Sequence, residues 1–285
     1  MLYINSNDKI IPNEKESIKT GNRSYLYGDG VFESIRIIKG HPINLENHIS
    51  RLLEGAKMIM MQTSDRFDTA FFKGRIIELL FESGIKGDAK CRLSLDRSPG
   101  GSYAPSSNDA DFYIEVYPIT ETGFSLNEKG KQVDIYTDYK KQKSKLSNFK
   151  TKNGLLFIMA SIAAQRNGLE DYLLTSETGG ILESTNSNLF VVSNGVLYTP
   201  GLEEGCLAGT MRMQIINLAI SNGIKVYECN ILPQNLLIAD EVFLTNAIQG
   251  VQWVGSFRTK RYFNVVSKKM NNLLNEKWLN ESVEN

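Results

Sequence analysis

The hydrophobic residues of this chain follow two different spacings. Apolar positions recur every three or four residues in five segments, which is the spacing of an amphipathic helix. We therefore predict helices over residues 45–60, 66–81, 153–166, 210–222 and 264–279. The fourth of these ends at Asn222-Gly223, a pair that commonly ends a helix.

Shorter runs, rich in β-branched and aromatic residues, predict strands. The first is a small hairpin over residues 2–11 that turns at Ser6-Asn7-Asp8. The others lie at residues 27–38, 90–96, 111–119, 133–136, 171–175, 189–193, 195–199, 225–229 and 241–245. Helices and strands are mixed with little regular strand–helix–strand alternation, which favours an α+β fold.

The segment 120–131 is polar and lacks a regular pattern, so we place a domain boundary there. It divides the chain into an N-terminal α/β subdomain at 1–120 and a C-terminal subdomain at 121–285. A chain of 285 residues is long enough for two modest domains. We expect the two subdomains to meet at a cleft.

Composition narrows the classes of function. Lys and Arg together number 32, as do Asp and Glu, so no net charge favours nucleic acid or a membrane surface as a partner. Three widely spaced cysteines give no pattern for disulfides or a metal site and fit a reducing compartment. No apolar run approaches the roughly 20 residues needed to span a bilayer, and the first residues do not resemble a signal peptide. We expect a cytoplasmic protein without a bound metal.

Glu183 stands in a segment that suggests a ligand site. It follows Gly179-Gly180 and precedes the hydroxyl and amide residues of 184–188. We predict that the flanking strands, 171–175 and 189–193, pair as a hairpin through the glycine turn. A carboxylate held there would be rigid and could bind a polar group of a ligand, although such a residue taken singly is more often an exposed turn carboxylate.

Lys150 is the candidate nucleophile. A lysine amine can hold an aldehyde as a Schiff base, and Lys150 lies just before the third predicted helix in a Lys-x-x-Asn pattern. Six lysines crowd residues 140–152, however, and lysines in such runs are usually solvated. Lys150 fits the pattern and Lys152 does not.

Two segments offer donors for a phosphate. Gly209, Thr210 and Met211 begin the fourth predicted helix, where backbone N–H groups and the positive end of the helix dipole converge. Arg51 lies on the first predicted helix and offers a guanidinium for bidentate recognition. Taken singly, an ordinary capped helix and a solvated arginine explain these residues equally well.

These segments occur in an order that is similar to that of a known family. Residues 27–36, Tyr-Gly-Asp-Gly-Val-Phe-Glu-Ser-Ile-Arg, resemble the Tyr-Gly-x-x-Val-Phe-Glu-Gly-Ile-Arg signature of branched-chain aminotransferases. The segment from His48 to Leu52, which contains Arg51, resembles the His-x-x-Arg-Leu helix of the same family. With Lys150, Glu183 and residues 205–213, the chain resembles the aminotransferase class IV family of fold-type IV pyridoxal-phosphate enzymes.

The resemblance implies the cofactor pyridoxal 5'-phosphate and a role for each candidate residue. Lys150 would bond to its aldehyde and later act as general base, and Glu183 would pair with its pyridine nitrogen. The phosphate would be bound by Arg51 and by the residues Gly209, Thr210, Met211, Asn246 and Ala247. The substrate pocket would contain Tyr27, Phe32, Arg92, Arg97 and Ile248. The resemblance also implies a homodimer and an active site in the cleft between the subdomains.

Three functions remain open. Residues 27–36 favour an aminotransferase that moves an amino group from a branched-chain-like amino acid to a 2-keto acid such as 2-oxoglutarate. Asn246-Ala247 and the loop that begins at Asp96-Arg97 resemble instead the aminodeoxychorismate lyase branch, which would release pyruvate to give 4-aminobenzoate. As a form of the first function, transfer from D-amino acids is less favoured, because D-amino-acid aminotransferases typically have tyrosine where Phe32 stands. The third function, a non-enzymatic binder that uses residues 140–152, is disfavoured by the neutral charge.

Overall fold

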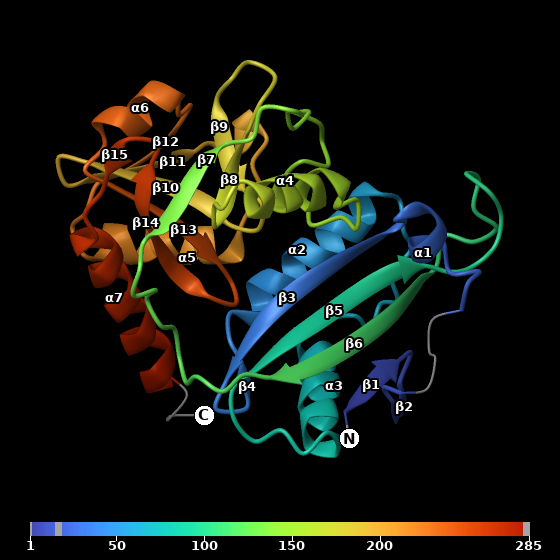
Figure 1. Cartoon of the computed structure of the whole chain (residues 1–285). Helices are drawn as coiled ribbons and strands as arrows, with labels where there is room; N and C mark the ends of the chain where they lie inside the picture. The colour runs from blue at the N-terminus through green and yellow to red at the C-terminus, as the bar shows by residue number, and fades with distance from the viewer. Residues whose placement is uncertain (1, 15–18, 282–285) are drawn as a thin grey trace. The chain divides into compact units, whose positions relative to one another are not determined.

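The computed structural model describes residues 2–14 and 19–281 (Figure 1). The chain divides into two compact units. The first contains the described residues up to Gly123 together with Phe149–Asn153, and the second contains Phe124–Asn148 and Gly154–Asn280. The short segment that carries Lys150 therefore belongs to the N-terminal unit. The predicted domain limits, 1–120 and 121–285, stay a prediction, and their outer ends at residues 1 and 282–285 lie outside the described residues.

The first unit is built on an antiparallel sheet with the strand order β2-β1-β6-β5-β3-β4. Its strands are β1 (Tyr3–Ser6), β2 (Lys9–Pro12), β3 (Gly30–Ile38), β4 (His41–Pro42), β5 (Ala89–Arg97) and β6 (Ala110–Pro118). The predicted N-terminal hairpin is confirmed. Asn7 and Asp8 turn between β1 and β2 with φ of 49° and 67°, a conformation that these residue types tolerate.

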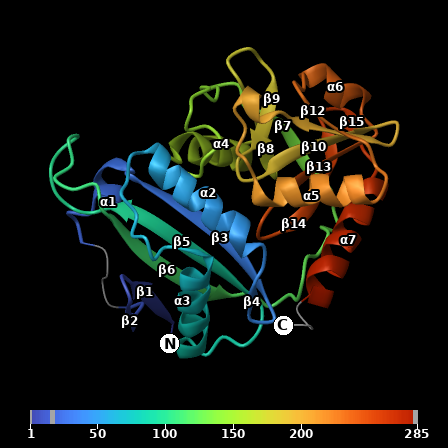
Figure 2. The ribbon, with the colours of Figure 1, turned by 180° about the vertical axis from the view of Figure 1, so that it is seen from behind.

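Two helices, α2 (Leu45–Met58) and α3 (Thr69–Glu82), cover one face of this sheet (Figures 1 and 2). Alternate residues of β5, and most alternate residues of β3, belong to the hydrophobic core beneath these helices. The residues between them point to the opposite face of the sheet. Phe32, Arg92 and Asp96 are among these. The two candidate pocket residues and the carboxylate of Asp96 therefore share the face that α2 and α3 do not cover.

The second unit contains a sheet that closes on itself. The strand order is β12-β11-β10-β13-β14-β7-β8-β9, with β15 beside β14, and β9 pairs again with β10. The strands are β7 (Lys131–Ile135), β8 (Asp171–Thr175), β9 (Ile181–Ser184), β10 (Asn188–Ser193), β11 (Val196–Pro200), β12 (Val226–Cys229), β13 (Glu241–Asn246), β14 (Gly250–Phe257) and β15 (Lys260–Arg261). The strands from β10 round to β9 therefore form a barrel-like ring.

Helices pack around this ring. They are α4 (Leu155–Arg166), α5 (Thr210–Ser221), α6 (Pro233–Ile238) and α7 (Val265–Glu281), with a short 3₁₀ turn at Leu202–Glu204. The core between strands and helices is apolar and includes the stacked rings of Phe190 and Phe243, whose centroids are 5.0 Å apart. No helix in the described part of the chain is long and apolar enough to cross a membrane.

Most predicted elements are confirmed to within a few residues, but one predicted pairing is wrong. Residues 171–175 and 189–193 do not pair with each other. Instead, the residues around Glu183 form a strand of their own, β9, which pairs with β8 on one side and places Glu183 opposite Asn188 of β10 on the other. The elements that were not predicted are α1 (Arg23–Tyr27), α6, β9, β14, the two-residue strands β4 and β15, and the 3₁₀ turn at Leu202–Glu204. The two helices are too short to show a periodic pattern, and glycines interrupt the pattern of β14.

Candidate functional site

Lys150 lies on an extended segment that pairs with the start of β3 through an antiparallel bridge. The N–H of Phe32 donates to the carbonyl of Lys150 at 3.0 Å, and the N–H of Lys152 donates to the carbonyl of Gly30 at 2.9 Å. These two hydrogen bonds flank Thr151, so the backbone that follows Lys150 is bonded to the sheet of the first unit.

The amine of Lys150 lies over an aromatic ring. Its Nζ is 4.3 Å from the ring centroid of Phe32, and the guanidinium carbon of Arg92 is 3.9 Å from the same centroid. Arg92 also pairs with Glu115 at 4.0 Å, and burial lowers the pKa of Arg92 although the charge of Glu115 opposes this shift. An amine, an apolar ring and a guanidinium thus lie together on one face of the sheet.

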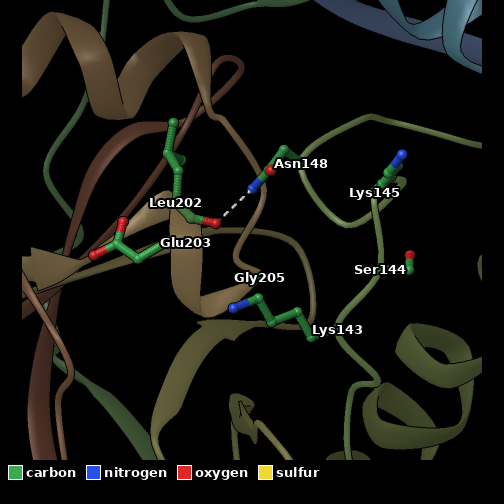
Figure 3. A pocket seen from close by; sticks show the side chains of 7 residues that line it. All are labelled: Lys143, Ser144, Lys145, Asn148, Leu202, Glu203 and Gly205. Atoms are coloured by element: carbon green, nitrogen blue, oxygen red, sulfur yellow. Dashed lines mark hydrogen bonds between the residues drawn. The ribbon is translucent and has the colours of Figure 1, made fainter.

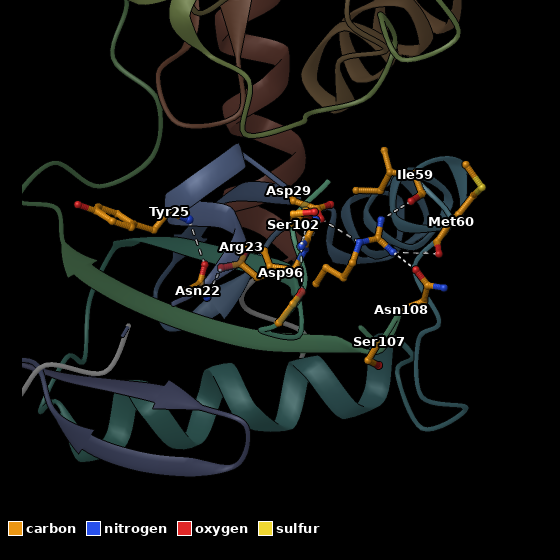
Figure 4. Close-up of polar contacts among 12 residues, drawn as sticks. Asn22, Arg23, Tyr25, Asp29, Ile59, Met60, Asp96, Ser102, Ser107 and Asn108 are labelled. Carbon is orange, nitrogen blue, oxygen red and sulfur yellow. Dashed lines mark hydrogen bonds and ion pairs between the residues drawn. The ribbon is translucent and has the colours of Figure 1, made fainter. Parts of the chain in front are cut away.

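Arg97 has quite different surroundings from Arg92. It is buried, and its guanidinium donates to Asp29 Oδ2, to Asn108 Oδ1 and to the carbonyls of Ile59 and Met60 (Figure 4). All three guanidinium nitrogens have protein acceptors, so the structure gives Arg97 the task of joining loops at the end of β5.

Tyr27 ends α1 and is 38% exposed. Its ring centroid lies 5.6 Å from that of Tyr103, and the guanidinium carbon of Arg23 lies 5.0 Å from it. Tyr103 is 91% exposed, so the two rings form an aromatic surface that is accessible in the first unit.

Arg51, on α2, is held by a buried glutamate. Glu33 of β3 accepts hydrogen bonds from Nε and Nη2 of Arg51 at 2.7 and 2.5 Å, and its Oε2 lies 2.7 Å from Nδ1 of His48. Burial alone would raise the pKa of Glu33, but the charge of Arg51 and the bond with His48 outweigh it and lower the pKa to about 2. Burial lowers the pKa of His48, although Glu33 opposes this. A neutral His48 and an ionised Glu33 therefore fix the guanidinium of Arg51.

Glu183 is buried on β9, and each of its carboxylate oxygens has a partner. Oε1 lies 2.5 Å from Nζ of Lys141, and Oε2 accepts a hydrogen bond from the N–H of Leu207 at 2.9 Å. Lys141 also donates to the carbonyl of Ser147 at 3.2 Å. Because a carboxylate oxygen can accept two hydrogen bonds, Glu183 is an oriented anion that can still accept an N–H of a ligand.

The start of α5 has the chemistry of an anion site. Gly209 is its N-cap residue and has no side chain that could bond the N–H groups of the first turn, where the buried residues Thr210 and Met211 lie. A Cβ atom at position 209 would collide with Oδ1 of Asn188, so only glycine fits there. The first turn of α5 therefore presents backbone donors and the positive end of the helix dipole.

Asn246, Ala247 and Ile248 form the turn after β13. The side chain of Asn246 shapes this turn, since its Oδ1 accepts from the N–H of Ile248 at 3.0 Å and its Nδ2 donates to Ser187 Oγ at 2.9 Å. The hydroxyl of the preceding residue, Thr245, is buried and has no hydrogen-bond partner among the described residues. A buried hydroxyl without a partner is uncommon and marks a position where a bound group would satisfy it.

Asn188 connects these parts of the second unit. It lies opposite Glu183 on one neighbouring strand and opposite Thr245 on the other, and its side chain touches Gly209. The structure therefore brings together Glu183, the start of α5 and the turn after β13. In the first unit it brings together Lys150, Phe32 and Arg92. Arg51 is bonded to Glu33 instead, and the guanidinium of Arg97 is bonded to residues of the neighbouring loops.

A pocket of about 450 Å³ lies in the second unit (Figure 3). It is lined by Lys143, Ser144, Lys145, Asn148, Leu202, Glu203 and Gly205. The side-chain amide of Asn148 donates to the carbonyls of Leu202 and Cys206 at 3.0 and 2.6 Å, which ties the residues before Lys150 to the loop before α5.

Glu33, Lys141 and Asn188 were missed by the sequence predictions. Glu33 carried a usable signal, because a charged residue at an alternate position of an otherwise apolar strand requires a buried partner. Lys141 lay within the lysine run and had no signal of its own. In the described residues, no group of three or more His, Cys, Asp or Glu is arranged to hold a metal ion.

The sequence matches the family described as Amino-transferase class IV over residues 30–257. A Methanocaldococcus jannaschii protein named "Putative branched-chain-amino-acid aminotransferase" is 30% identical over 251 residues, covering 86% of this chain and 83% of the relative. A D-alanine aminotransferase of Bacillus licheniformis is 27% identical, covering 84% and 83%. An aminodeoxychorismate lyase of Vibrio harveyi is 25% identical, covering 82% and 85%.

Solved structures share the fold. The branched-chain aminotransferase of Thermoproteus uzoniensis, solved with norvaline, superposes with a TM-score of 0.88 at 23% identity and covers 96% of this chain and 93% of its own. At this level of identity, the similarity shows the fold alone. The two-unit α+β architecture is that of the fold-type IV enzymes.

Proposed function

Because this chain belongs to the class IV aminotransferase family, we propose that it moves an amino group from a branched-chain-like amino acid to a 2-keto acid such as 2-oxoglutarate. Pyridoxal 5'-phosphate is the proposed cofactor, and Lys150 is the proposed covalent residue. The main support is the position of Lys150 Nζ over Phe32, with Arg92 over the same ring.

The residues present fit a phosphorylated pyridine aldehyde. An aldehyde needs an amine, and Lys150 offers one. A phosphate needs N–H donors, and the first turn of α5 offers them behind Gly209, where an added Cβ atom would collide with Oδ1 of Asn188. A protonated pyridine nitrogen needs an anionic acceptor, which the buried carboxylate of Glu183 supplies.

Lys150 has two tasks in this proposal. When bound, pyridoxal 5'-phosphate supplies an aldehyde and an electron-accepting ring that stabilises negative charge on the α-carbon of an amino acid. Lys150 would hold the cofactor through its aldehyde, since Nζ is the amine that can form a Schiff base with loss of water. With substrate bound, the same Nζ would act as general base and move the proton from the α-carbon of the amino acid to the aldehyde carbon of the cofactor. The Phe32 ring covers one side of this amine and excludes water there.

With pyridoxal 5'-phosphate bound, the carboxylate of Glu183 would pair with the protonated pyridine nitrogen. Its two protein partners, the Lys141 ammonium and the Leu207 N–H, both stabilise the carboxylate form and hold it in one orientation. Lys141 thus supplies a counter-charge within the second unit.

The phosphate is assigned to the first turn of α5, with Gly209, Thr210 and Met211, and to the turn at Asn246-Ala247. Arg51 is assigned to it through the family resemblance. Two of the five N–H donors of its guanidinium bond to Glu33, which fixes the position of the group.

The Phe32 and Arg92 pair supports the choice of substrates. The ring offers apolar contact to a branched side chain, and the guanidinium offers a bidentate partner for a carboxylate of the keto acid. Tyr27 adds an accessible aromatic surface. Arg97 is not used in this proposal, because its donors already bond to protein acceptors.

Release of pyruvate from aminodeoxychorismate is the second candidate function. It is favoured by the Asn246-Ala247 pair, which resembles the lyase branch and builds the turn after β13. A lyase relative is 25% identical over most of both chains. Because another relative is a D-alanine aminotransferase, both L- and D-amino acids have to be compared as amino-group donors.

A substrate comparison separates these functions. Purified protein loaded with pyridoxal 5'-phosphate is incubated with 2-oxoglutarate and L-valine, L-leucine, L-isoleucine or D-alanine, and glutamate is measured. In parallel, aminodeoxychorismate is supplied without an acceptor, and pyruvate is measured. We expect glutamate from the branched-chain donors. Pyruvate from aminodeoxychorismate, with no glutamate from any amino acid, would contradict the aminotransferase proposal and support the lyase.

We also infer a homodimer, as the family resemblance implies. Helix α4 supports a self-association surface, because Leu155, Ile158 and Ile162 lie on one side of it and are 71%, 55% and 43% exposed. Light scattering of the eluted protein is expected to give twice the chain mass of 32.0 kDa. A single-chain mass at all concentrations would contradict this inference. The cytoplasmic location stays a prediction.

A further inference from the structure

Lys152, two residues after Lys150, forms a buried ion pair within the first unit. Its Nζ lies 2.5 Å from Oδ1 of Asp96 and donates to Ser24 Oγ at 2.9 Å. Asp96 is completely buried, and its other oxygen accepts from Nδ2 of Asn22 at 3.4 Å (Figure 4). The ammonium of Lys152 is therefore engaged by a carboxylate and a hydroxyl.

The backbone of the Tyr27–Gly30 motif is shaped around this ion pair. A Cβ atom on Gly30 would lie 2.6 Å from Oδ1 of Asp96 and 3.1 Å from Cδ of Lys152, so a side chain at position 30 would push the pair apart. Gly28 has φ of +67° and leaves room for Asn153, whose Oδ1 would lie 2.8 Å from an added Cβ. Both glycines of the motif thus make close contact with the residues that follow Lys150.

The pair also fixes the register of the segment. Lys150 and Lys152 are two residues apart on an extended chain, so both amines project to the same side, where Phe32 and Asp96 also lie. A shift of two residues that brought Lys152 to the position of Lys150 would take the amine of Lys152 away from Asp96, and a shift of one would turn both amines away from that side. Only one backbone bridge joins the segment to β3 among the described residues, so backbone pairing by itself specifies the register weakly.

Stability alone is a weak reason for such a pair. A buried ion pair is often no more stabilising than apolar side chains of the same size, because both charges lose their hydration. Its well-supported use is to specify one arrangement among several, since the unpaired alternative leaves a charge buried. Here the alternative register would leave the fully buried Asp96 without a cation.

We propose that Asp96 captures the amine of Lys152 and thereby sets the register in which Lys150, not Lys152, is presented for covalent chemistry. Asp96 and Lys152 are positioning residues, because they act through the backbone of Lys150. The inference rests on the proposed function, and it adds a reason within the chain for the choice between two neighbouring lysines.

The test uses the full chain with pyridoxal 5'-phosphate added. Lys152→Met and Asp96→Asn remove the ion pair, Lys152→Arg restores a cation, and Lys86→Met removes an exposed lysine of the same unit as a matched control. Three quantities are measured for each protein. They are the rate of covalent attachment after borohydride quenching, the labelled lysine by peptide mapping, and the pH titration of the visible absorbance of the bound cofactor. Urea unfolding shows which variants are folded.

We expect attachment at Lys150 to slow about tenfold in Lys152→Met and Asp96→Asn, which corresponds to roughly 1.4 kcal/mol of lost positioning. The pH titration should shift in both, and Asp96→Asn should place part of the label on Lys152. Lys152→Arg should recover most of the rate, and Lys86→Met should match the wild type. If Lys152→Met does not fold, Ser24→Ala, which removes one contact of the same amine, should give a smaller slowing.

Two results overturn the inference. One is that Lys152→Met and Asp96→Asn are folded and both show the attachment rate and the pH titration of the wild type. The other, should Lys152→Met fail to fold, is wild-type behaviour of Ser24→Ala and Asp96→Asn. A wild-type protein that carries no label on Lys150 contradicts the proposed function instead, so the two failures can be told apart.

Discussion

Lys141 Nζ lies 2.5 Å from Oε1 of Glu183, and this contact joins two side chains that are 11% and 4% exposed. The remaining oxygen of Glu183 is bonded by a backbone N–H, so the carboxylate has one orientation and a counter-charge before any ligand binds. An acid that must remain ionised beside a cofactor ring requires both properties. The lysine run at residues 140–152 therefore contains at least one lysine with a structural task.

Lys141→Met should leave the buried carboxylate of Glu183 without its cation. We expect the free energy of unfolding to fall by about 3 kcal/mol, the usual cost of removing one partner of a buried ion pair. The double variant with Glu183→Gln should be less destabilised than the sum of the single variants, by about 1 kcal/mol or more. Urea unfolding of the four proteins measures this coupling. If the losses of stability in the two single variants add up to the loss in the double variant, the contact between Lys141 and Glu183 contributes nothing to stability.

Glu33 should make stability depend on acid pH. Its pKa is about 2 in the folded protein, below the ordinary value of 4.5 for a glutamate side chain, so the ionised form stabilises the fold above pH 4.5. This contribution, roughly 3 kcal/mol, should be lost as the pH falls from 4.5 toward 2. Glu33→Gln should therefore lower stability at pH 7 and narrow its difference from wild type only below pH 4.5. A constant difference over that range would argue against the assigned charge.

His48 should act in a separate pH window. Burial lowers its folded pKa below the ordinary 6.5, so the unfolded chain takes up a proton first as the pH falls. Stability should therefore decrease below pH 6.5 until the folded pKa is reached. His48→Gln should remove this part of the pH dependence, because glutamine can bond to Glu33 without titrating. Urea midpoints between about pH 7 and pH 5 test the prediction, and identical slopes in both proteins would contradict it.

Gly209→Ala should weaken cofactor binding. The added methyl group would collide with Oδ1 of Asn188, so either the start of α5 or Asn188 must move. Overpacking of this kind costs about 1–3 kcal/mol, and we expect the Kd for pyridoxal 5'-phosphate to rise about tenfold or more. Gly74→Ala is the matched control, since nothing lies within 4 Å of its Cβ on the exposed side of α3. It should stabilise the helix slightly and leave the Kd unchanged.

Arg92→Met should weaken the binding of 2-oxoglutarate, the amino-group acceptor, more than the binding of the amino-acid donor. A hydrogen bond from a guanidinium to a carboxylate contributes about 2 kcal/mol, so the KM for 2-oxoglutarate should rise about thirtyfold. The KM for 2-oxo acids with apolar side chains should change much less. Arg166→Met, on the exposed side of α4, is the control for loss of one positive charge. An equal rise in KM for both classes of keto acid would show that Arg92 does not bind the side-chain carboxylate of 2-oxoglutarate.

Much of this fold could be predicted from local patterns. The helix α2 follows from its apolar spacing, and α5 follows from its apolar spacing and from the glycines at its two ends, Gly209 and Gly223. The motif residues around Lys150 and Glu183 were found because short segments carry family-specific chemistry. Such signals lie within a dozen residues and need no knowledge of the rest of the chain.

The contacts that hold these residues could not be predicted, because their partners are distant in sequence. Lys141 and Glu183 are 42 positions apart, and Lys152 and Ser24 are 128 apart. Nothing local distinguishes Lys141 from the other lysines near it. The strand β9 was missed for another reason, since its four residues are all buried and therefore show no alternation of polar and apolar positions.

Identification of the side chain that bonds to the cofactor is the decisive experiment. Wild-type protein is incubated with pyridoxal 5'-phosphate, reduced with borohydride, digested and mapped by mass spectrometry, with Lys150→Ala treated in the same way. We expect a single modified lysine, Lys150, and no label in the variant. Label on Lys141 or Lys152 in the wild type, or an unlabelled protein, would contradict the proposed role of Lys150.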